Sequence, residues 1–423
     1  MRNQWTTAKL GSVASVVASG VDKHVLPEET PVRLCNYLDV YRNRRLTRPY
    51  EFSGGSVTQS EAKRFTIQKG DVIITKDSET PDDIAVPCLI ADDFENTVCG
   101  YHLALIRPGN NLNPGFLSYL FQSETARRYF HSKAAGLTRF GLNPRTIASY
   151  PVPLPSPDEQ AAIARVLDAV ETLVERAKAS IGKAERLQKG LMQQLLTGRL
   201  KPDGTLRRED EFQATKIGWL PKEWTVARVK EFGEVSTGKT PPTANEANFG
   251  GDYQFITPGD MGETKWIRKS ERSLSALGSE HAGVLTANTV CVVCIGATIG
   301  KIGITVRPAC TNQQINSVAC SDKHFPEYLY YALRHRSQHL LAIAGVNATP
   351  QLNKSDFSKY RLPMPATPDE EKAIGAKLAA FDDLLDAKHA KIAALQRLKK
   401  SLMQNLLTGH IRLSVDSTAK KGK

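Results

Sequence analysis

The sequence predicts an α+β protein with two globular modules of mixed α/β character, each followed by a long helix. We expect the two helices to pack against each other as an antiparallel coiled coil, which gives the chain pseudo-two-fold symmetry. Three observations support this fold class: an internal repeat, an apolar heptad in each copy of the repeat, and similar endings of the two segments that precede the copies.

The internal repeat has an offset of 211 residues and runs without a gap over more than forty residues. Pro157–Gln160 is followed 38 residues later by Leu195–Leu200, and Pro368–Glu371 is followed at the same interval by Leu406–Ile411. A long segment that occurs twice in one chain indicates a scaffold that presents two similar modules.

Each copy carries the signals of a helix start and a helix end. Ser156 and Thr367 are expected N-caps, with proline at the first helical position. The glutamate three residues after each cap is expected to reach back to it, as in a capping box. Gly198 and Gly409 can take the left-handed conformation that ends a helix.

Apolar residues in both copies recur at alternating steps of four and three, which is the spacing of a coiled-coil seam. A helix of forty residues forms a rod of roughly 60 Å. Gln188, Lys388 and Lys399 interrupt the seam. Two core helices of ordinary bundles are the alternative, but many charged residues lie outside the narrow apolar stripe. The seam residues expected to form the coiled coil and its docking surface are Ile163, Leu167, Val170, Val174, Ile181, Ile374, Leu378, Phe381, Leu385 and Ile392.

The segments before the two helices are faintly related to each other. Each ends with Leu-Asn, then Tyr, then Pro-x-Pro. Each also contains a helix-like stretch after a proline, at 114–130 and 326–343, and a strand-like apolar run, at 71–76 and 289–294. The expected boundaries are 1–155 for module 1, 156–200 for the first helix, 201–215 for a linker, 216–366 for module 2, 367–412 for the second helix, and 413–423 for a basic tail expected to be disordered.

The composition is that of an ordinary globular protein, with 41% apolar and 24% charged residues. We find no signal-peptide pattern and no run of about twenty apolar residues. Seven cysteines, an odd number, favour a reducing cytoplasm over a disulfide framework. Cys291 and Cys294 resemble half a zinc site, but they lie in a strand-like run that points them to opposite faces, so no metal site is expected.

The net charge of +12 and the pI near 9.3 favour a polyanionic partner. Two loops, 41–50 and 265–272, combine basic side chains with aromatic residues. Arginine can contact phosphate and guanine, and asparagine can contact adenine. The alternative for each loop is a solvated surface run. The residues expected to contact DNA are Arg42, Asn43, Arg44, Arg45, Arg48, Arg139, Lys265, Arg268, Lys269 and Arg272.

One segment, 233–240, formally matches the phosphate-binding P-loop pattern. A P-loop needs a helix to begin at its Gly-Lys-Thr, whereas Pro241–Pro242 follow at once and oppose a helix. The segment 296–301 is one residue too short, and a tight turn beside a strand is the simpler interpretation. No catalytic residue is therefore expected.

With these features the chain resembles the specificity subunit of Type I restriction–modification systems, over nearly its whole length. Gln160 matches the family's usual helix start, whereas Glu371 departs from it; we expect little effect, because either side chain suits a first helical turn. Module 1 lacks the Gly-Ala-Thr-Ile-Gly stretch and is assigned to a different recognition subclass. The motifs that carry the resemblance are Pro157–Gln160, Pro368–Glu371, the Leu-Leu-Thr-Gly helix ends, the Pro-x-Pro helix entries, Thr240–Pro241, Thr257–Asp260 and Gly296–Gly303.

The resemblance implies that each module is a target-recognition domain that reads one half of a split, asymmetric sequence in double-stranded DNA. It implies that the helices set the gap between the halves and dock two copies of a methyltransferase subunit. Two copies of an endonuclease and translocase subunit would join them. No cofactor is expected in this chain; S-adenosylmethionine, ATP and Mg²⁺ would belong to the partner subunits, and no membrane is involved.

Two other functions stay open on the sequence. The first is a non-catalytic coiled-coil scaffold that joins partners without reading DNA sequence. The second is a standalone ATPase or nuclease, which rests on the match at 233–240 alone.

Overall fold

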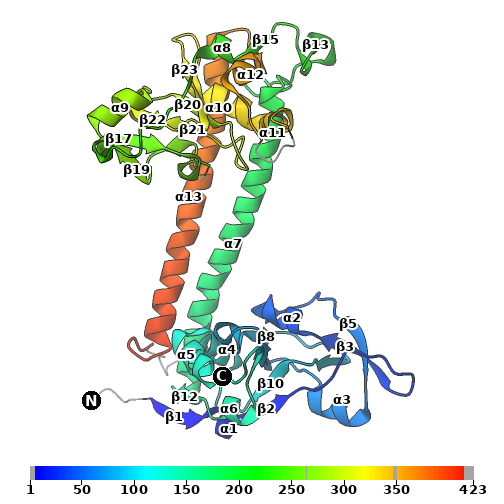
Figure 1. Ribbon diagram of the computed structural model, residues 1–423. Helices are drawn as coiled ribbons and strands as arrows, with labels where there is room; N and C mark the ends of the chain where they lie inside the picture. Colours follow the sequence, from blue (N-terminus) through cyan, green and yellow to red (C-terminus); the bar gives the residue numbers. More distant parts are fainter. Residues whose placement is uncertain (1–4, 263, 346–349, 414–423) are drawn as a thin grey trace. The chain divides into compact units, whose positions relative to one another are not determined.

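The computed structural model describes residues 5–262, 264–345 and 350–413. The chain forms two compact units. Unit 1 comprises Met1–Lys178 and Lys391–Lys423, and unit 2 comprises Ala179–Ala390. Each unit therefore contains one module together with parts of both long helices, α7 (Pro157–Leu196) and α13 (Pro368–Leu406) (Figure 1).

Module 1 contains a five-stranded sheet and a three-stranded sheet. The larger sheet has the order β2 (Ala14–Ala18), β10 (Leu103–Pro108), β6 (Val72–Thr75), β8 (Pro87–Ile90) and β4 (Arg45–Leu46). Its strands are antiparallel except for the parallel pair β4 and β8. The smaller sheet has the order β5 (Ser53–Val57), β3 (Thr30–Cys35) and β9 (Thr97–Cys99). Two short pairs complete the module: β1 (Thr6–Lys9) with β12 (Pro151–Leu154), and β7 (Asp77–Ser78) with β11 (Phe140–Gly141).

Module 2 has the same topology. Its larger sheet has the order β16 (Gly233–Thr237), β23 (Ile315–Cys320), β20 (Val290–Val293), β21 (Ile302–Thr305) and β18 (Trp266–Ile267), with β18 and β21 parallel. Its smaller sheet has the order β19 (Arg272–Leu274), β17 (Phe249–Ile256) and β22 (Ala309–Thr311). β15 (Thr225–Arg228) pairs with β24 (Arg361–Met364) as β1 pairs with β12. The faint relation between the two modules is thus confirmed by their strand order.

The segment between α7 and module 2, expected to be a linker, contains structure of its own. A 3-10 turn at Glu209–Glu211 leads into β13 (Phe212–Thr215), which forms a hairpin with β14 (Gly218–Pro221).

Each of the two helix-like stretches after a proline is in fact a pair of helices. In module 1 these are α4 (Pro114–Gln122) and α5 (Glu124–Lys133), because Ser123 is extended and caps α5. In module 2 they are α10 (Pro326–His335) and α11 (Ser337–Ile343). The shorter helices are α1 (Leu10–Val13), α2 (Tyr37–Tyr41), α3 (Gln59–Phe65), α6 (Pro144–Ala148), α8 (Val229–Phe232), α9 (Ala276–Ala282) and α12 (Lys354–Lys359).

Both large sheets bury apolar side chains on both faces. In module 2, Val290, Val292 and Cys294 join a core that includes α10, whereas Cys291 and Val293 belong to a separate core. The two cysteines therefore point to opposite sides of the sheet, which confirms the predicted direction of their side chains.

The long helices begin and end close to the expected positions. Ser156 accepts a hydrogen bond from the backbone N–H of Glu159 at 3.3 Å, and Thr367 accepts one from Glu370 at 3.2 Å. The prediction that these glutamates reach back to their caps is wrong. Their carboxylates instead bind a tryptophan and an arginine of their own unit, because these groups offer charge-assisted hydrogen bonds.

Within each unit the helix segments run antiparallel, and the polar interruptions of the seam mark the register. In unit 1, Lys399 forms an ion pair with Glu171 at 2.5 Å. In unit 2, Lys388 donates to Ser180 at 2.6 Å, and Gln188 donates to Asp382 at 2.5 Å. Of the predicted seam residues, eight are buried, and Phe381 and Ile392 are half-buried.

No helix within the part of the chain that the structure describes is long and apolar enough to span a membrane. Residues 414–423 of the expected basic tail lie outside the described residues.

Candidate nucleic-acid interface

The basic loop of module 1 is partly engaged in holding the module on α7. Arg44 lies 3.7 Å from both Asp168 and Glu171, and its guanidinium covers the ring of Tyr119 at 4.8 Å. Arg45 forms a 2.7 Å ion pair with Asp168. These ion pairs hold module 1 on α7, and the predicted DNA contact of Arg44 and Arg45 stays a prediction.

Module 2 docks on its helix segments with similar chemistry. Lys265 precedes β18 as Arg44 precedes β4, and it is only 7% exposed. Its ammonium lies over the rings of Trp266 at 4.9 Å and Tyr331 at 5.6 Å. The hydroxyl of Tyr331 donates to Asp382, as Tyr119 donates to Asp168 in unit 1. Lys265 is therefore buried against aromatic residues of module 2, and its predicted DNA contact stays a prediction.

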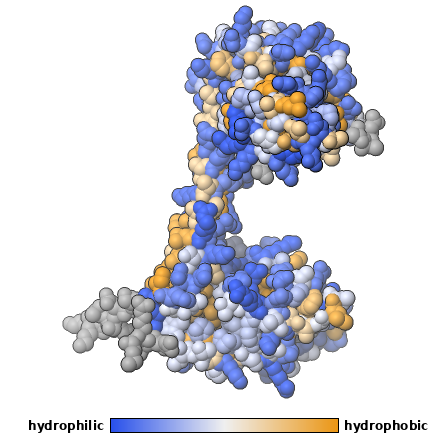
Figure 2. Space-filling model, turned by 60° about the vertical axis from the view of Figure 1, so that its left-hand side comes forward, coloured by the Kyte–Doolittle hydropathy of each residue, from blue (hydrophilic) through white to orange (hydrophobic). Residues whose placement is uncertain are grey.

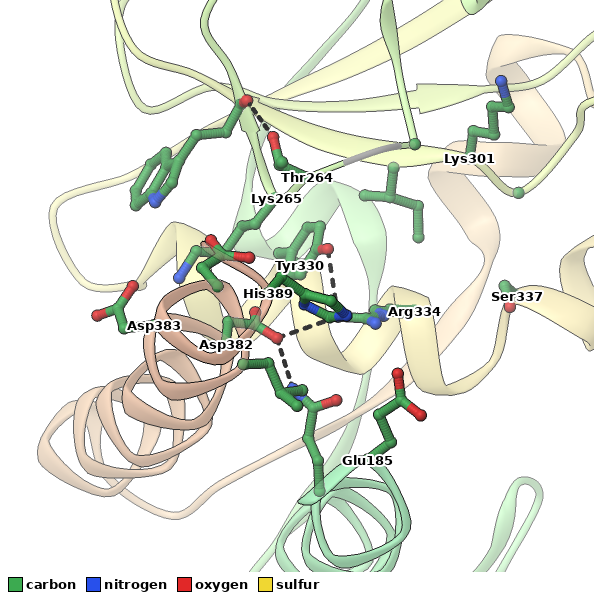
Figure 3. A pocket seen from close by; sticks show the side chains of 17 residues that line it. Glu185, Thr264, Lys265, Lys301, Tyr330, Arg334, Ser337, Asp382, Asp383 and His389 are labelled. Atoms are coloured by element: carbon green, nitrogen blue, oxygen red, sulfur yellow. Dashed lines mark hydrogen bonds and ion pairs between the residues drawn. The ribbon is translucent and has the colours of Figure 1, made fainter. Parts of the chain in front are cut away.

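A cleft of about 570 Å³ lies where module 2 meets the helix segments of unit 2 (Figure 3). Three residues contact the carboxylate of Asp382 in this cleft: Gln188, Arg334 and Tyr331. These contacts join module 2 to α13 through Arg334 and Tyr331, and join α13 to α7 through Gln188.

The remaining residues predicted to contact DNA differ in whether other groups of the protein engage their side chains. Asn43 donates to the backbone oxygen of Asp39 and to the hydroxyl of Tyr50, so its amide is used within module 1. Arg272 stacks on Phe249 at 4.7 Å. Four others are exposed, and no ion pair within the described ranges engages their side chains: Arg42, Arg48, Arg268 and Lys269.

Arg139 is exposed and lines a separate cleft of about 390 Å³ in module 1. His102 and Tyr37 line the same cleft. His102 could not be selected from the sequence, because a single histidine in a short turn carries no periodic or charge signal.

The P-loop-like segment is part of a packed turn. The N–H of Gly238 donates to Ile315 at 3.1 Å, and a Cβ atom at Gly238 would overlap Thr311 and the backbone beside it. Thr240 donates to Gln313 at 2.6 Å. The structure assigns no helix to residues 238–245, which confirms that the context of a P-loop is missing. The segment 296–301 forms the predicted turn, between β20 and β21.

The structure offers little for metal or thiol chemistry. No group of three or more His, Cys, Asp or Glu side chains among the described residues could hold a metal ion. Burial raises the pKa of the Cys291 and Cys294 thiols to about 12, so both remain protonated and unreactive at neutral pH.

A leucine face lies on the helix segments of each unit. It consists of Leu173 and Leu398 in unit 1 and of Leu187 and Leu384 in unit 2, all 46–59% exposed. Each leucine immediately precedes a seam position, and in an antiparallel pair such positions flank the same edge of the seam. Figure 2 shows apolar patches on the exposed surface of the helices.

The two leucine faces are equivalent under the repeat. Leu173 corresponds to Leu384, and Leu187 corresponds to Leu398. The modules contact the helix segments through two acids, Glu171 and Asp382. Each acid lies four residues after a seam position, so both flank the edge of the seam opposite the leucines. The leucine faces are therefore left uncovered by the modules.

Comparisons with known proteins agree on one family. The sequence profile described as "Type I restriction modification DNA specificity domain" matches residues 3–185 and 221–397. The Type I restriction enzyme HindI specificity subunit of Haemophilus influenzae is 25% identical over 97% of this chain and 100% of its own length. The MjaIX specificity subunit of Methanocaldococcus jannaschii is 32% identical, over 47% of either chain, so the chain spans about half the length of that relative.

The fold also matches a solved structure. The crystal structure of the Type I restriction–modification S subunit from M. genitalium is similar with a TM-score of 0.60 at 14% identity, covering 96% of this chain and 97% of the other.

Proposed function

The chain belongs to the Type I restriction–modification DNA specificity family, and we propose that it reads a bipartite, asymmetric DNA target while docking the subunits that act on that DNA. Module 1 reads one half of the target, and module 2 reads the other. Two methyltransferase subunits and two endonuclease subunits bind the chain. S-adenosylmethionine, ATP and Mg²⁺ are bound by those subunits.

The shared topology of the two modules is the observation that supports a bipartite target. Both have the strand orders described above, yet their loops differ in sequence and length. A common frame with different loops binds the same kind of ligand with different specificity. Two such frames in one chain suit two different half-sites of one DNA molecule.

The charge supports DNA as the ligand. The chain carries a net charge of +12, and each module keeps exposed cations that no described ion pair neutralises: Arg42 and Arg48 in module 1, Arg268 and Lys269 in module 2. Contacts of this kind with phosphate position a protein on the duplex and make binding depend steeply on salt.

The equivalent leucine faces support the docking of two identical partners. A pair of half-exposed leucines in each unit presents the same apolar surface twice, and one such surface per unit fits one partner copy. We propose that the methyltransferase subunits bind there, on the edge of the seam away from the modules.

The function is tested by sequencing N6-methyladenine in DNA from cells that co-express this chain with its neighbouring methyltransferase, against cells that lack the chain. A bipartite motif methylated only when the chain is present supports the proposal. An assembled complex that produces no sequence-specific methylation contradicts it and leaves the coiled-coil scaffold as the function.

The docking surface is tested separately by the double variant Leu187→Glu/Leu384→Glu in a pull-down of the methyltransferase. We expect binding to be lost from one of the two sites, so that the complex retains one copy. Leu277→Glu is the matched control, because Leu277 is also an exposed leucine of unit 2 but lies on α9. Unchanged stoichiometry in the double variant would exclude the leucine face as the docking site.

A further inference from the structure

One short turn occupies the same place in both modules. In module 1, Gly100–His102 joins β9 to β10, and in module 2, Asn312–Gln314 joins β22 to β23. The backbone of each turn is held in the same way. Lys76 donates its N–H to the oxygen of His102 at 2.9 Å, and Cys294 donates to the oxygen of Gln314 at 2.8 Å.

The next contact along the chain is also equivalent. Leu142 donates its N–H to the oxygen of Lys76, and Leu352 donates to the oxygen of Cys294, both at 2.8 Å. The two turns are therefore matched residue by residue. Tyr101 and His102 of module 1 stand where module 2 has Gln313 and Gln314.

In module 1 the side chains of this turn are fixed in place. The Nδ1 atom of His102 lies 2.7 Å from Asp77, which also binds the ammonium of Lys76 at 2.7 Å. The rings of Tyr101 and His102 are 4.0 Å apart, and Lys76 lies 5.1 Å from the centroid of Tyr101. The other imidazole nitrogen, Nε2, is then the atom left for a ligand.

The backbone of module 1 is strained at this turn. His102 has a φ of 68°, a left-handed conformation that few non-glycine residues adopt. Such strain is retained where the surrounding structure imposes it, often at binding sites. Tyr101 is 49% exposed although it is aromatic, so burial does not explain its place in the turn.

In module 2 the side chains of the turn are fixed by different partners. The Oε1 atom of Gln313 accepts from Thr240 at 2.6 Å, and that of Gln314 accepts from Asn312 at 3.0 Å. Both amides are thereby oriented through their oxygens. Their Nε2 donors have no protein partner in the described parts of the chain.

Cationic side chains stand beside both turns. Arg139 lines the 390 Å³ cleft together with His102 in module 1. Lys239 directly precedes Thr240, the partner of Gln313, and is exposed. Each turn thus combines oriented hydrogen-bonding groups with a nearby positive charge, which is the combination that DNA recognition requires.

We propose that this turn is the base-reading element of each module: Tyr101 and His102 contact base edges in one half-site, and Gln313 and Gln314 contact base edges in the other. Glutamine amides match the donor and acceptor pattern of adenine in the major groove, and imidazole matches acceptor or donor atoms of a base edge. The chemical difference between the two turns accounts for two different half-sites on one common frame. This inference rests on the proposed function.

The test uses the full chain in complex with its methyltransferase and reads the methylated motif by sequencing. In module 1 we substitute Tyr101→Ala and His102→Ala, and in module 2 Gln313→Ala and Gln314→Ala. We expect one or two specified bases of a single half-site to become degenerate, with methylation of the relaxed sites rising about 10-fold or more. The opposite half-site and the spacer stay unchanged.

Two exposed glutamines provide matched controls that leave the motif intact: Gln59→Ala on α3 of module 1 and Gln338→Ala on α11 of module 2. The double exchange Tyr101→Gln/His102→Gln covers the case in which an alanine variant does not fold, because it places side chains from the equivalent turn on the same backbone. We expect it to alter the specified bases of the module 1 half-site.

The inference is overturned if the variants methylate the unchanged motif fully, or if they lose methylation evenly with no change of motif. Either result leaves the proposed function standing, provided the unmodified chain directs bipartite methylation. Absence of a bipartite motif with the unmodified chain overturns the proposed function first, and this inference with it.

Discussion

Trp224 donates a hydrogen bond from its indole Nε1 to the carboxylate of Glu370 at 3.1 Å. Arg207, which follows the end of α7, binds the same carboxylate at 2.7 Å and lies over the indole at 5.6 Å. Gly198, at the end of α7, packs beside Trp224. The start of α13 is thus joined to the end of α7 through one aromatic residue of unit 2.

Unit 1 repeats this arrangement. Trp5 donates to Glu159 at 3.2 Å, Arg412 binds Glu159 at 2.7 Å and covers the indole at 5.2 Å, and Gly409 packs on the same ring. The repeated Thr-Gly sequence therefore does more than end a helix. It places a residue without a side chain against the tryptophan, where the two helices meet.

We expect Arg207→Ala to lower the free energy of unfolding of unit 2 by about 3 kcal/mol, because it leaves the Glu370 carboxylate partly buried without its charged partner. Denaturant unfolding followed by tryptophan fluorescence measures this change. Arg208→Ala is the control: Arg208 is exposed and pairs with the exposed Asp210 and, at 3.8 Å, with the half-buried Glu211, so its removal changes stability by less than about 0.5 kcal/mol. Equal effects of the two variants would contradict the role given to Arg207.

Replacing glycine by alanine along α7 is expected to raise stability at some positions and to lower it at another. Gly182 and Gly190 lie inside the helix with open space around them, so Gly182→Ala and Gly190→Ala each raise stability by up to about 1 kcal/mol. Gly198 has a φ of 69°, and an added Cβ would overlap Pro221, so Gly198→Ala lowers stability. Thermal unfolding of the three variants under one condition ranks them, and a stabilised Gly198→Ala would refute the packing described above.

The salt dependence of DNA binding separates phosphate contacts from docking residues. We expect Arg268→Ala and Lys269→Ala each to reduce the slope of log K against log salt by about 1. Arg45→Ala instead costs about 1–2 kcal/mol of stability through its bond to Asp168 and leaves the slope unchanged. Titration of duplex DNA at several salt concentrations measures the slope, and a reduced slope for Arg45→Ala would return Arg45 to the DNA interface.

The two helix starts differ at their fourth residue, and this difference affects stability with pH. Gln160 is buried and donates to the backbone oxygens of Asn111 and Pro155 at 3.0 Å. Glu371 accepts instead, from His324 at 2.9 Å and from the N–H of Phe325 at 3.2 Å. The two helix starts therefore differ in hydrogen bonding at this position, because Glu371 places a buried carboxylate where Gln160 places an amide donor.

Burial raises the pKa of Glu371 above its usual 4.5, although the hydrogen bonds from His324 and Phe325 oppose this. Since the folded state then holds the proton more tightly than the unfolded chain, the contribution of Glu371 to stability falls as the pH rises above about 4.5. We expect Glu371→Gln to be more stable by about 1 kcal/mol at pH 7 and to lose this advantage at pH 4. Asp369→Asn serves as the control, because Asp369 is an exposed residue of the same helical turn.

The local chemistry of the chain allowed much of the fold to be predicted. Proline and a hydroxyl at each helix start, glycine at each end, and a heptad between them located α7 and α13 to within a few residues. The strands β6 and β20 were recognisable from their apolar runs. These signals are short-range, so a linear sequence contains them in full.

The contacts of the candidate site residues could not be predicted, because charge alone does not show where a side chain is directed. Arg44, Arg45 and Lys265 were selected for their charge, yet they contact helices far away in the sequence. The equivalence of Tyr101–His102 and Gln313–Gln314 has no sequence similarity behind it. It became visible only when both strand orders and their backbone hydrogen bonds could be compared.

The sequence by itself determined the repeat, the two helices with their polar seam positions, and the family of the chain. The tertiary structure alone decided which side chains meet: Trp5 with Glu159 across 154 residues, and Glu159 with Arg412 across 253. The physical reason is that helix caps and apolar periods act between neighbours along the chain. Hydrogen bonds and ion pairs between distant residues exist only after the modules and helices have packed, so no local pattern records them.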